Sequence, residues 1–236
     1  MKKKTVSLLA LVASFYWGPA VAADCGGLFS AKENREFDIS DVARLKISGR
    51  VDLNLVQSET FGLSIEARKK QFNDLTVSAS NNTLTIKPNA CDDTDYQVKL
   101  RLPRIELLDV AGAVNLNSRG VFQTESMNLE ISGALDGEME LAAVQLNLDV
   151  SGSSNLQLSG SADSTYMDIS GSSEVDARYL VTKTVRLDVS GSSNVVVNVA
   201  DELRIDASGS TDIAYLGTPK LNIDIAGSGS IRALDD

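Results

Sequence analysis

The chain has no histidine, two cysteines and a 5% content of aromatic residues. Without histidine, neither a Ser-His-Asp nor a Cys-His catalytic arrangement can form. The two cysteines have no metal-ligand spacing, so zinc sites and redox motifs are excluded as well. Within the repeats described below the aromatic residues are few, namely Phe122, Tyr166, Tyr179 and Tyr215. These absences predict a protein that is not an enzyme and that carries no cofactor and no metal.

The only long apolar run lies at the N-terminus. Residues 2–4 are lysines, residues 6–17 are apolar or small, and residues 20–22 read Ala-Val-Ala. This order is typical of a secretory signal peptide covering residues 1–22, with the mature chain beginning at Ala23. The run is too short to span a bilayer, which needs about 20 apolar residues. A retained anchor and a lipoprotein at Cys25 are the alternatives, although Asp24 is unfavourable for lipidation.

Basic residues are outnumbered by acidic ones. The formal net charge is −10. Removing residues 1–22 takes away three lysines and no acids, so the mature chain carries −10 − 3 = −13. Such a chain repels nucleic acid and anionic lipid headgroups. We therefore expect an exported protein of the periplasm or the cell surface, with no nucleic-acid partner and no transmembrane segment in the mature chain.

Export also bears on the two cysteines. Cys25 lies near the mature terminus and Cys91 lies in a polar loop. Disulfides form and persist outside the cytoplasm, so we expect a Cys25–Cys91 bond. Closing so long a loop would stabilise the fold by about 4 kcal/mol in the chain-entropy model. Two free thiols are the alternative.

One phrase recurs seven times between Leu107 and Ile231. The copies read LDVAGAVNL, LEISGALDG, LDVSGSSNL, MDISGSSEV, LDVSGSSNV, IDASGSTDI and IDIAGSGSI. Their glycines are Gly112, Gly133, Gly152, Gly171, Gly191, Gly209 and Gly227. A period of about 20 residues indicates a solenoid. One copy cannot bury its own apolar face, so neighbouring copies must stack to form a single core.

Each copy alternates apolar and polar residues around its glycine. The second and fourth residues before the glycine are apolar, as in Leu148 and Val150, and polar residues stand between them. Alternation of this kind predicts a strand with one buried face. Turn-forming residues follow the glycine, and a further apolar position follows them. Each rung is therefore predicted to be a strand, a tight glycine corner and a second strand, stacked in parallel with its neighbours.

Before Leu107 the pattern is looser. Residues 45–49 match the left half of the phrase, and further alternating segments cover residues 63–65, 75–77, 84–86 and 98–102. We interpret them as wider first coils, or a cap, of the same structure. The expected organisation is a signal peptide (1–22), an N-terminal segment (23–36) and an all-β solenoid domain (37–236).

The corners also resemble those of a known family. The SGSS and SGST corners beginning at Ser151, Ser170, Ser190 and Ser208 are similar to the repeated SGSG of the head GIN domain family, described as the head of autotransporter adhesins. The resemblance covers about residues 37–234. It implies a right-handed parallel β-helix-like solenoid in an exported bacterial protein, and no catalytic residues. Ala111 and Ala226 depart from it, because serine is usual there.

An acid stands three residues before the glycine in every copy. Stacked rungs would align these acids as candidate binding residues: Asp109, Glu130, Asp149, Asp168, Asp188, Asp206 and Asp224. Neighbouring carboxylates about 5 Å apart repel each other by about 0.8 kcal/mol in water. Calcium between the rungs would offset this repulsion. We expect solvated side chains instead, because the Gly-Gly-x-Gly-x-Asp pattern of calcium-binding rolls is missing.

A second array consists of serine, threonine and asparagine after the glycine, such as Ser153, Ser154 and Asn155. These residues could bind sugar hydroxyls, but turn formation accounts for them equally and is the interpretation we favour. The favoured function is a non-catalytic, adhesin-like envelope protein whose repeated polar face contacts a glycan or an envelope protein. The alternatives are a periplasmic structural or assembly protein and a β-helix polysaccharide-active enzyme.

Overall fold

The computed structural model describes residues 31–88 and 96–235. The expected signal peptide and both cysteines lie outside these residues, so the signal and the Cys25–Cys91 bond remain predictions. Within the described part, no helix is long and apolar enough to cross a membrane.

The part of the chain that the structure describes is almost entirely β-structure. Six strands and one short helix precede the repeats: β1 (Lys32–Phe37), β2 (Arg44–Gln57), β3 (Gly62–Arg68), the 3-10 helix η1 (Gln71–Asp74), β4 (Leu75–Ser80), β5 (Thr83–Pro88) and β6 (Tyr96–Leu102). Eight strands make up the repeats: β7 (Leu107–Arg119), β8 (Phe122–Gly152), β9 (Asn155–Gly171), β10 (Glu174–Gly191), β11 (Asn194–Gly209), β12 (Asp212–Leu216), β13 (Lys220–Gly227) and β14 (Ser230–Ala233).

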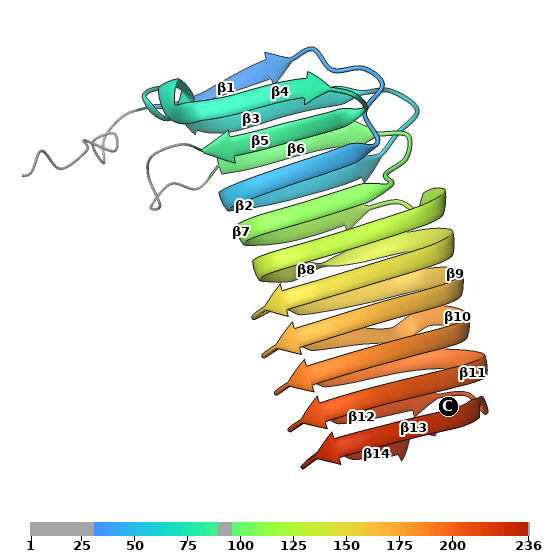
Figure 1. The fold of residues 1–236 in the computed structure, drawn as a ribbon. Coiled ribbons are helices and arrows are strands. Elements are labelled where there is room, and N and C mark those ends of the chain that lie inside the picture. The colour runs from blue at the N-terminus through green and yellow to red at the C-terminus, as the bar shows by residue number, and fades with distance from the viewer. Residues whose placement is uncertain (1–30, 89–95, 236) are drawn as a thin grey trace, which may run out of the picture.

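β7 follows β2 in the stack, and from β7 onward the rungs stack in chain order and wind down the molecule to β14 (Figure 1). Every pairing from β2–β7 to β12–β14 is parallel. β11 pairs with both β12 and β13, because one rung wraps around two sides of the stack. The predicted parallel solenoid of short rungs is therefore confirmed.

The repeated glycines are aligned down one edge of the stack. Gly171 pairs in register with Gly152 on one side and with Gly191 on the other. A Cβ atom built on Gly171 would collide with the backbone carbonyl oxygen of Gly152. The φ angle of Gly171 is +117°, a conformation that residues with a side chain rarely adopt. The corner needs glycine because successive backbones approach too closely for any side chain.

The core lies between the two sides of the rungs. Leu148, Val150, Leu187 and Val189 are all buried, as the alternation predicts. Burying one aliphatic side chain contributes roughly 1.5–3 kcal/mol. The stack therefore derives its stability from a continuous column of side chains to which every rung contributes.

The N-terminal end is closed by antiparallel strands. β3 pairs antiparallel with both β1 and β6, and β4 pairs antiparallel with β5. β5 and β6 in turn pair parallel with β2, which joins these strands to the stack (Figure 1). The first segments thus form a cap over the first rung. β1 starts at Lys32, so the cap includes residues that precede the expected domain start at 37.

The opposite end of the stack is open. All eight residues of β13 are exposed, and Leu221, Ile223 and Ile225 keep about 40% of their surface accessible (40%, 41% and 40%). They occupy the positions that are buried in β11, since Leu203 pairs with Leu221 and Ile205 pairs with Ile223. The last rung therefore presents its apolar side chains at the end of the described structure.

Candidate functional site

The acids before each glycine do align into a row, which we call the acidic row. Asp149 pairs with Asp168, Asp168 with Asp188, and Asp188 with Asp206. Asp109 pairs with Glu130 at one end, and Asp206 pairs with Asp224 at the other. These side chains point away from the core, with Asp109 and Asp188 half-buried and the rest exposed. Within residues 31–88 and 96–235, no three acidic side chains converge to hold a metal ion.

Two members of the acidic row have cationic partners. Lys46, on the rung above, places its Nζ atom 2.6 Å from Asp109 Oδ2. Arg186 Nη2 lies 2.9 Å from Asp188 Oδ2. The Tyr166 hydroxyl donates a hydrogen bond to the same oxygen across 3.0 Å. Like-charge repulsion along the row is thus reduced at Asp109 and at Asp188.

This hydrogen bond affects the titration of Tyr166. Ionising the phenol would remove the proton that it shares with Asp188 and would place a second negative charge beside the carboxylate. Asp188 therefore raises the pKa of Tyr166 above its ordinary value of 10.0, and Arg186 lowers it by a smaller amount. The Arg186 guanidinium also lies 5.8 Å from the centre of the Tyr166 ring, within cation–π range.

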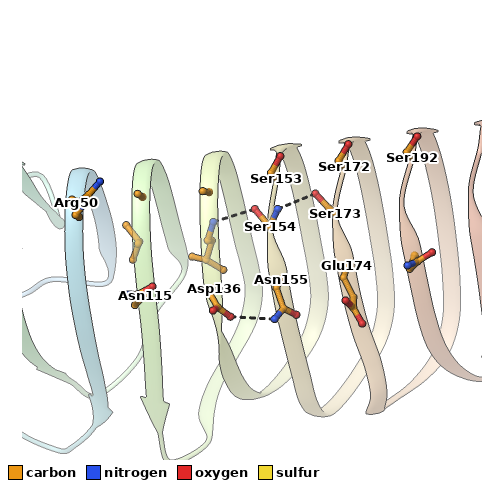
Figure 2. Close-up of a pocket in the computed structure, with 15 residues that line it drawn as sticks. Arg50, Asn115, Asp136, Ser153, Ser154, Asn155, Ser172, Ser173, Glu174 and Ser192 are labelled. Carbon is orange, nitrogen blue, oxygen red and sulfur yellow. Dashed lines mark hydrogen bonds between the residues drawn. The ribbon is translucent and has the colours of Figure 1, made fainter. Parts of the chain in front are cut away.

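The second candidate surface is the corner groove, a shallow hollow of about 570 Å³ beside the aligned glycines. It runs across six rungs, from Arg50 on β2 to Ser192 and Asn194 beyond β10 (Figure 2). The serines that follow the glycines, Ser153, Ser172 and Ser192, are exposed along its rim. The corner groove therefore carries one hydroxyl from each of three successive rungs.

The next serine in each corner has a structural role. Ser154 and Ser173 are buried, at 6% and 5% exposure. Ser154 Oγ accepts a hydrogen bond from the Leu135 backbone N–H at 3.2 Å, and Ser173 Oγ accepts one from the Ser154 N–H at 3.3 Å (Figure 2). Ser193 Oγ bonds the Ser173 N–H in the same way. These hydroxyls tie each corner to the rung before it, as the turn-forming interpretation predicts.

A third row, which we call the alternating row, lies three residues after each glycine. Its members are paired in register from rung to rung: Asp52, Asn115, Asp136, Asn155, Glu174, Asn194, Asp212 and Ser230. Acids alternate with uncharged residues along its whole length, so carboxylates are two rungs apart, or about 9.6 Å. At that distance salt screens most of their repulsion.

Three of the four uncharged members of the alternating row, Asn115, Asn155 and Ser230, hydrogen-bond an acidic neighbour. Asn115 Nδ2 donates to Asp52 Oδ1 at 2.7 Å, and Asn155 Nδ2 donates to Asp136 Oδ1 at 3.2 Å. Figure 2 shows the second of these bonds at the edge of the corner groove. Sequence reasoning missed this row, although counting three residues beyond each glycine would have found it. Unlike the acidic row, it offers hydrogen-bond donors and acceptors in turn.

These surfaces present the same kinds of polar group on successive rungs. The carboxylates repeat from rung to rung, and in the described structure only Asp109 and Asp188 of the acidic row have cationic partners. The exposed serines of the corner groove have no histidine to act as their base, since the chain contains none. Repeated hydroxyl, amide and carboxylate groups can instead hydrogen-bond an extended polar partner at several points.

Solved structures with a similar fold come from Bacteroides and Parabacteroides species. A "putative adhesin" from Bacteroides fragilis is 17% identical, with a TM-score of 0.76, covering 86% of this chain and 97% of its own. A "putative lipid binding protein" from Parabacteroides distasonis is 21% identical, with a TM-score of 0.66, covering 86% and 97%. A "putative adhesin" from Parabacteroides distasonis is 18% identical, with a TM-score of 0.62, covering 87% and 98%. At these identities the likeness shows the fold alone.

A search of curated proteins found no significant match. A family model described as "Putative auto-transporter adhesin, head GIN domain" matches residues 42–219. The match runs from just before β2 to the connection before β13, and so includes the corner groove and all of the acidic and alternating rows except Asp224 and Ser230. The resemblance seen in the SGSS corners is confirmed, and the chain belongs to this adhesin head GIN domain family.

Proposed function

We propose that this chain is an exported, non-catalytic envelope protein that binds a glycan through the corner groove. The alternating row is the observation that carries the proposal. It places an amide donor and a carboxylate acceptor on successive rungs, about 4.8 Å apart, beside a line of exposed serine hydroxyls. Sugar hydroxyls both donate and accept hydrogen bonds, so a surface that offers both in turn is complementary to them.

Three features support this choice over other partners. The net charge of −10 disfavours polyanions such as nucleic acid. The corner groove is shallow and polar, which suits an extended ligand better than a compact apolar one. The family's description as an auto-transporter adhesin supports an exported location and contact with a surface.

A structural or assembly role is the second candidate, and the open end of the stack favours it. β13 exposes Leu221, Ile223 and Ile225 together with an unpaired strand edge in the described structure. Edges of this kind are templates for pairing with another chain. An envelope protein partner would then contact the end of the solenoid rather than the corner groove.

A glycan array probed with mature chain 23–236 tests the proposal. We expect binding to one class of glycan, and loss of that binding in the double variant Asn115→Ala/Asn155→Ala, which removes two donors of the alternating row. The matched control is Asn147→Ala/Asn222→Ala, because it removes two asparagines that do not line the groove. Circular dichroism checks that both variants fold.

Two results would contradict the proposal. The first is an array with no glycan bound above background by the folded wild-type chain. The second is glycan binding that survives in Asn115→Ala/Asn155→Ala but is lost in the control variant, because the ligand would then contact a different face.

A further inference from the structure

A second hollow of different chemistry lies where the N-terminal cap meets the stack. We call it the basic cleft; it has a volume of about 670 Å³ and is more enclosed than the corner groove. Its floor is the outward face of β6, β2 and β7. There Asn54 lies between Lys99 and Asn117 in register, and Val56 lies between Arg101 and Arg119.

The cleft gathers positive charge on an acidic chain. Lys99, Arg101 and Arg119 all line it and are all exposed. None of the three forms an ion pair in the part of the chain that the structure describes, although seven other cations there do. Glu36 and Asp38 line the same cleft, yet neither pairs with these cations. Three cations are therefore left available to an anionic group from outside.

The local backbone supports the position of one of these cations. β3 pairs antiparallel with β6, which places Gly62 directly opposite Arg101. A Cβ atom built on Gly62 would lie 2.5 Å from Arg101 Nη2, so the guanidinium lies over a residue that has no side chain. The absence of that side chain leaves room for Arg101 to lie flat along the wall of the cleft.

The remaining lining is mixed. Asn54 and Asn117 add amide groups to the floor. Phe37 and Phe61 are half-buried, pack against the core and also line the cleft. A small inorganic anion is much smaller than the cleft. Such an anion bound to the cations would leave the amides and the phenyl rings without contacts. A ring with hydroxyl groups, an apolar face and one carboxylate would contact all three kinds of group.

We propose that the basic cleft binds the carboxylate-bearing ring of an acidic sugar, a uronic or sialic acid. Arginine suits the carboxylate because its planar fork donates two parallel hydrogen bonds. The amides of Asn54 and Asn117, with Glu36 and Asp38, are placed for the ring hydroxyls. A longer polyanion is disfavoured, because the rest of the chain is strongly negative.

The basic cleft and the corner groove are connected. A third shallow hollow shares Asn115 and Asp136 with the groove, and Asn54 and Asn117 with the cleft. A glycan lying in the groove can therefore extend toward the cleft across the faces of β2 and β7. The choice of a sugar rests on the proposed glycan-binding function, whereas the preference for an anion rests on the cleft alone.

Calorimetric titration of the mature chain at constant ionic strength, with sodium glucuronate, glucose and sodium sulfate as separate probes, tests this site. We expect glucuronate to bind at least about tenfold more tightly than glucose, which has the same ring without the carboxylate. A hydrogen bond to a charged group contributes about 1.5–3 kcal/mol, so Arg101→Gln and Arg119→Gln should each weaken glucuronate binding about tenfold or more. The matched control is Arg232→Gln, an exposed arginine on β14 at the other end of the stack.

Each further outcome decides one point. Sulfate binding as tight as glucuronate binding would overturn the sugar assignment, and equal binding of glucose and glucuronate would overturn the role of the cations. Unchanged glucuronate affinity in folded Arg101→Gln and Arg119→Gln would place the ligand elsewhere and overturn the site. Asn115→Ala/Asn155→Ala on the array reports on the corner groove and Arg101→Gln in the titration reports on the cleft, so a failed glycan array and a failed cleft would be distinguishable.

Discussion

Tyr166 and Asp188 lie on neighbouring rungs and share a hydrogen bond of 3.0 Å from the phenol to the carboxylate, although 22 residues separate them in sequence. The bond runs diagonally, because Tyr166 pairs in register with Arg186 and Asp188 pairs with Asp168. The hydrogen bond thus connects the acidic row to the position two residues before it, where Tyr166 and Arg186 pair. Of the acidic row, Asp188 is thus the member with both an arginine and a tyrosine partner.

The titration of Tyr166 should report this contact. Its pKa is raised, so the folded state favours the neutral phenol. The resulting stabilisation is fully present below the ordinary tyrosine pKa and is lost as the pH rises through the raised pKa. Asp188→Ala should lower the pKa of Tyr166 toward its ordinary value, because it removes the hydrogen bond and the neighbouring negative charge. Carbon-13 tyrosine NMR measures this pKa directly.

The control for the titration is Asp176→Ala. Asp176 is paired with Arg178 two residues away, as Asp188 is with Arg186, but it has no hydrogen bond to a tyrosine in the described structure. This variant should leave the titration of Tyr166 unchanged. An equal shift in both variants would mean that overall negative charge, rather than the contact with Asp188, sets the pKa of Tyr166.

Comparing Gly171 with Gly120 separates two reasons why a position requires glycine, namely a positive φ angle and the close approach of a neighbouring backbone. Both have positive φ, +117° and +83°. A Cβ atom on Gly120 would meet only the Gln57 side chain at 3.1 Å, whereas one on Gly171 would collide with the backbone of Gly152. Gly120→Ala should cost about 1–2 kcal/mol through φ alone. Gly171→Ala should cost clearly more, about 3 kcal/mol or above, because two rungs must separate. Urea unfolding measures both, and equal costs would refute the close approach.

Ile205 and Ile223 occupy the same position on successive rungs and pair in register. Ile205 is 1% exposed, whereas Ile223 is 41% exposed. Ile205→Ala should therefore destabilise the protein by about 2–5 kcal/mol, and Ile223→Ala by about 1 kcal/mol or less. Chemical denaturation of both variants is the measurement. A similar cost at both positions would mean that another surface covers β13 in solution.

The acidic row should not respond specifically to calcium. Its side chains project side by side from a regular sheet, whereas calcium requires six to eight oxygens around one point. Calcium chloride and sodium chloride of equal ionic strength should therefore change the melting temperature alike, through screening. A bound ion at a hundredfold excess over its dissociation constant would add about 2.7 kcal/mol. A calcium-specific rise that disappears in Asp168→Asn/Asp188→Asn would contradict this expectation.

The repeated part of the fold could be predicted from sequence, because its pattern is local. Alternation around each glycine identifies Leu187 and Val189 as buried and Asp188 as outward-pointing, and the structure confirms all three. Equal spacing of the copies then brings equivalent residues of successive rungs into register. For that reason the sequence alone predicts the acidic row.

The alternating row could also have been predicted from the equal spacing of the copies, but the variation in residue type made it hard to recognise. Asp136, Asn155 and Glu174 differ in type, so no single residue recurs at that position. The pairing register of the rungs shows that acids and uncharged residues alternate along the row. Hydrogen bonds such as Asn155–Asp136 show that they interact.

By itself, the sequence determined the rung, the inward-facing residues, the glycine corner and the family. The reason is that each copy of a short repeat stacks on the copies next to it in the chain. The tertiary structure decided the cap and the basic cleft. Arg101 on β6 and Arg119 on β7 come together because both strands pair with β2. Gly62 lies opposite Arg101 because β3 pairs antiparallel with β6. Outside the repeats, no periodicity sets which strand pairs with which, so the long-range pairing itself brings these cations together.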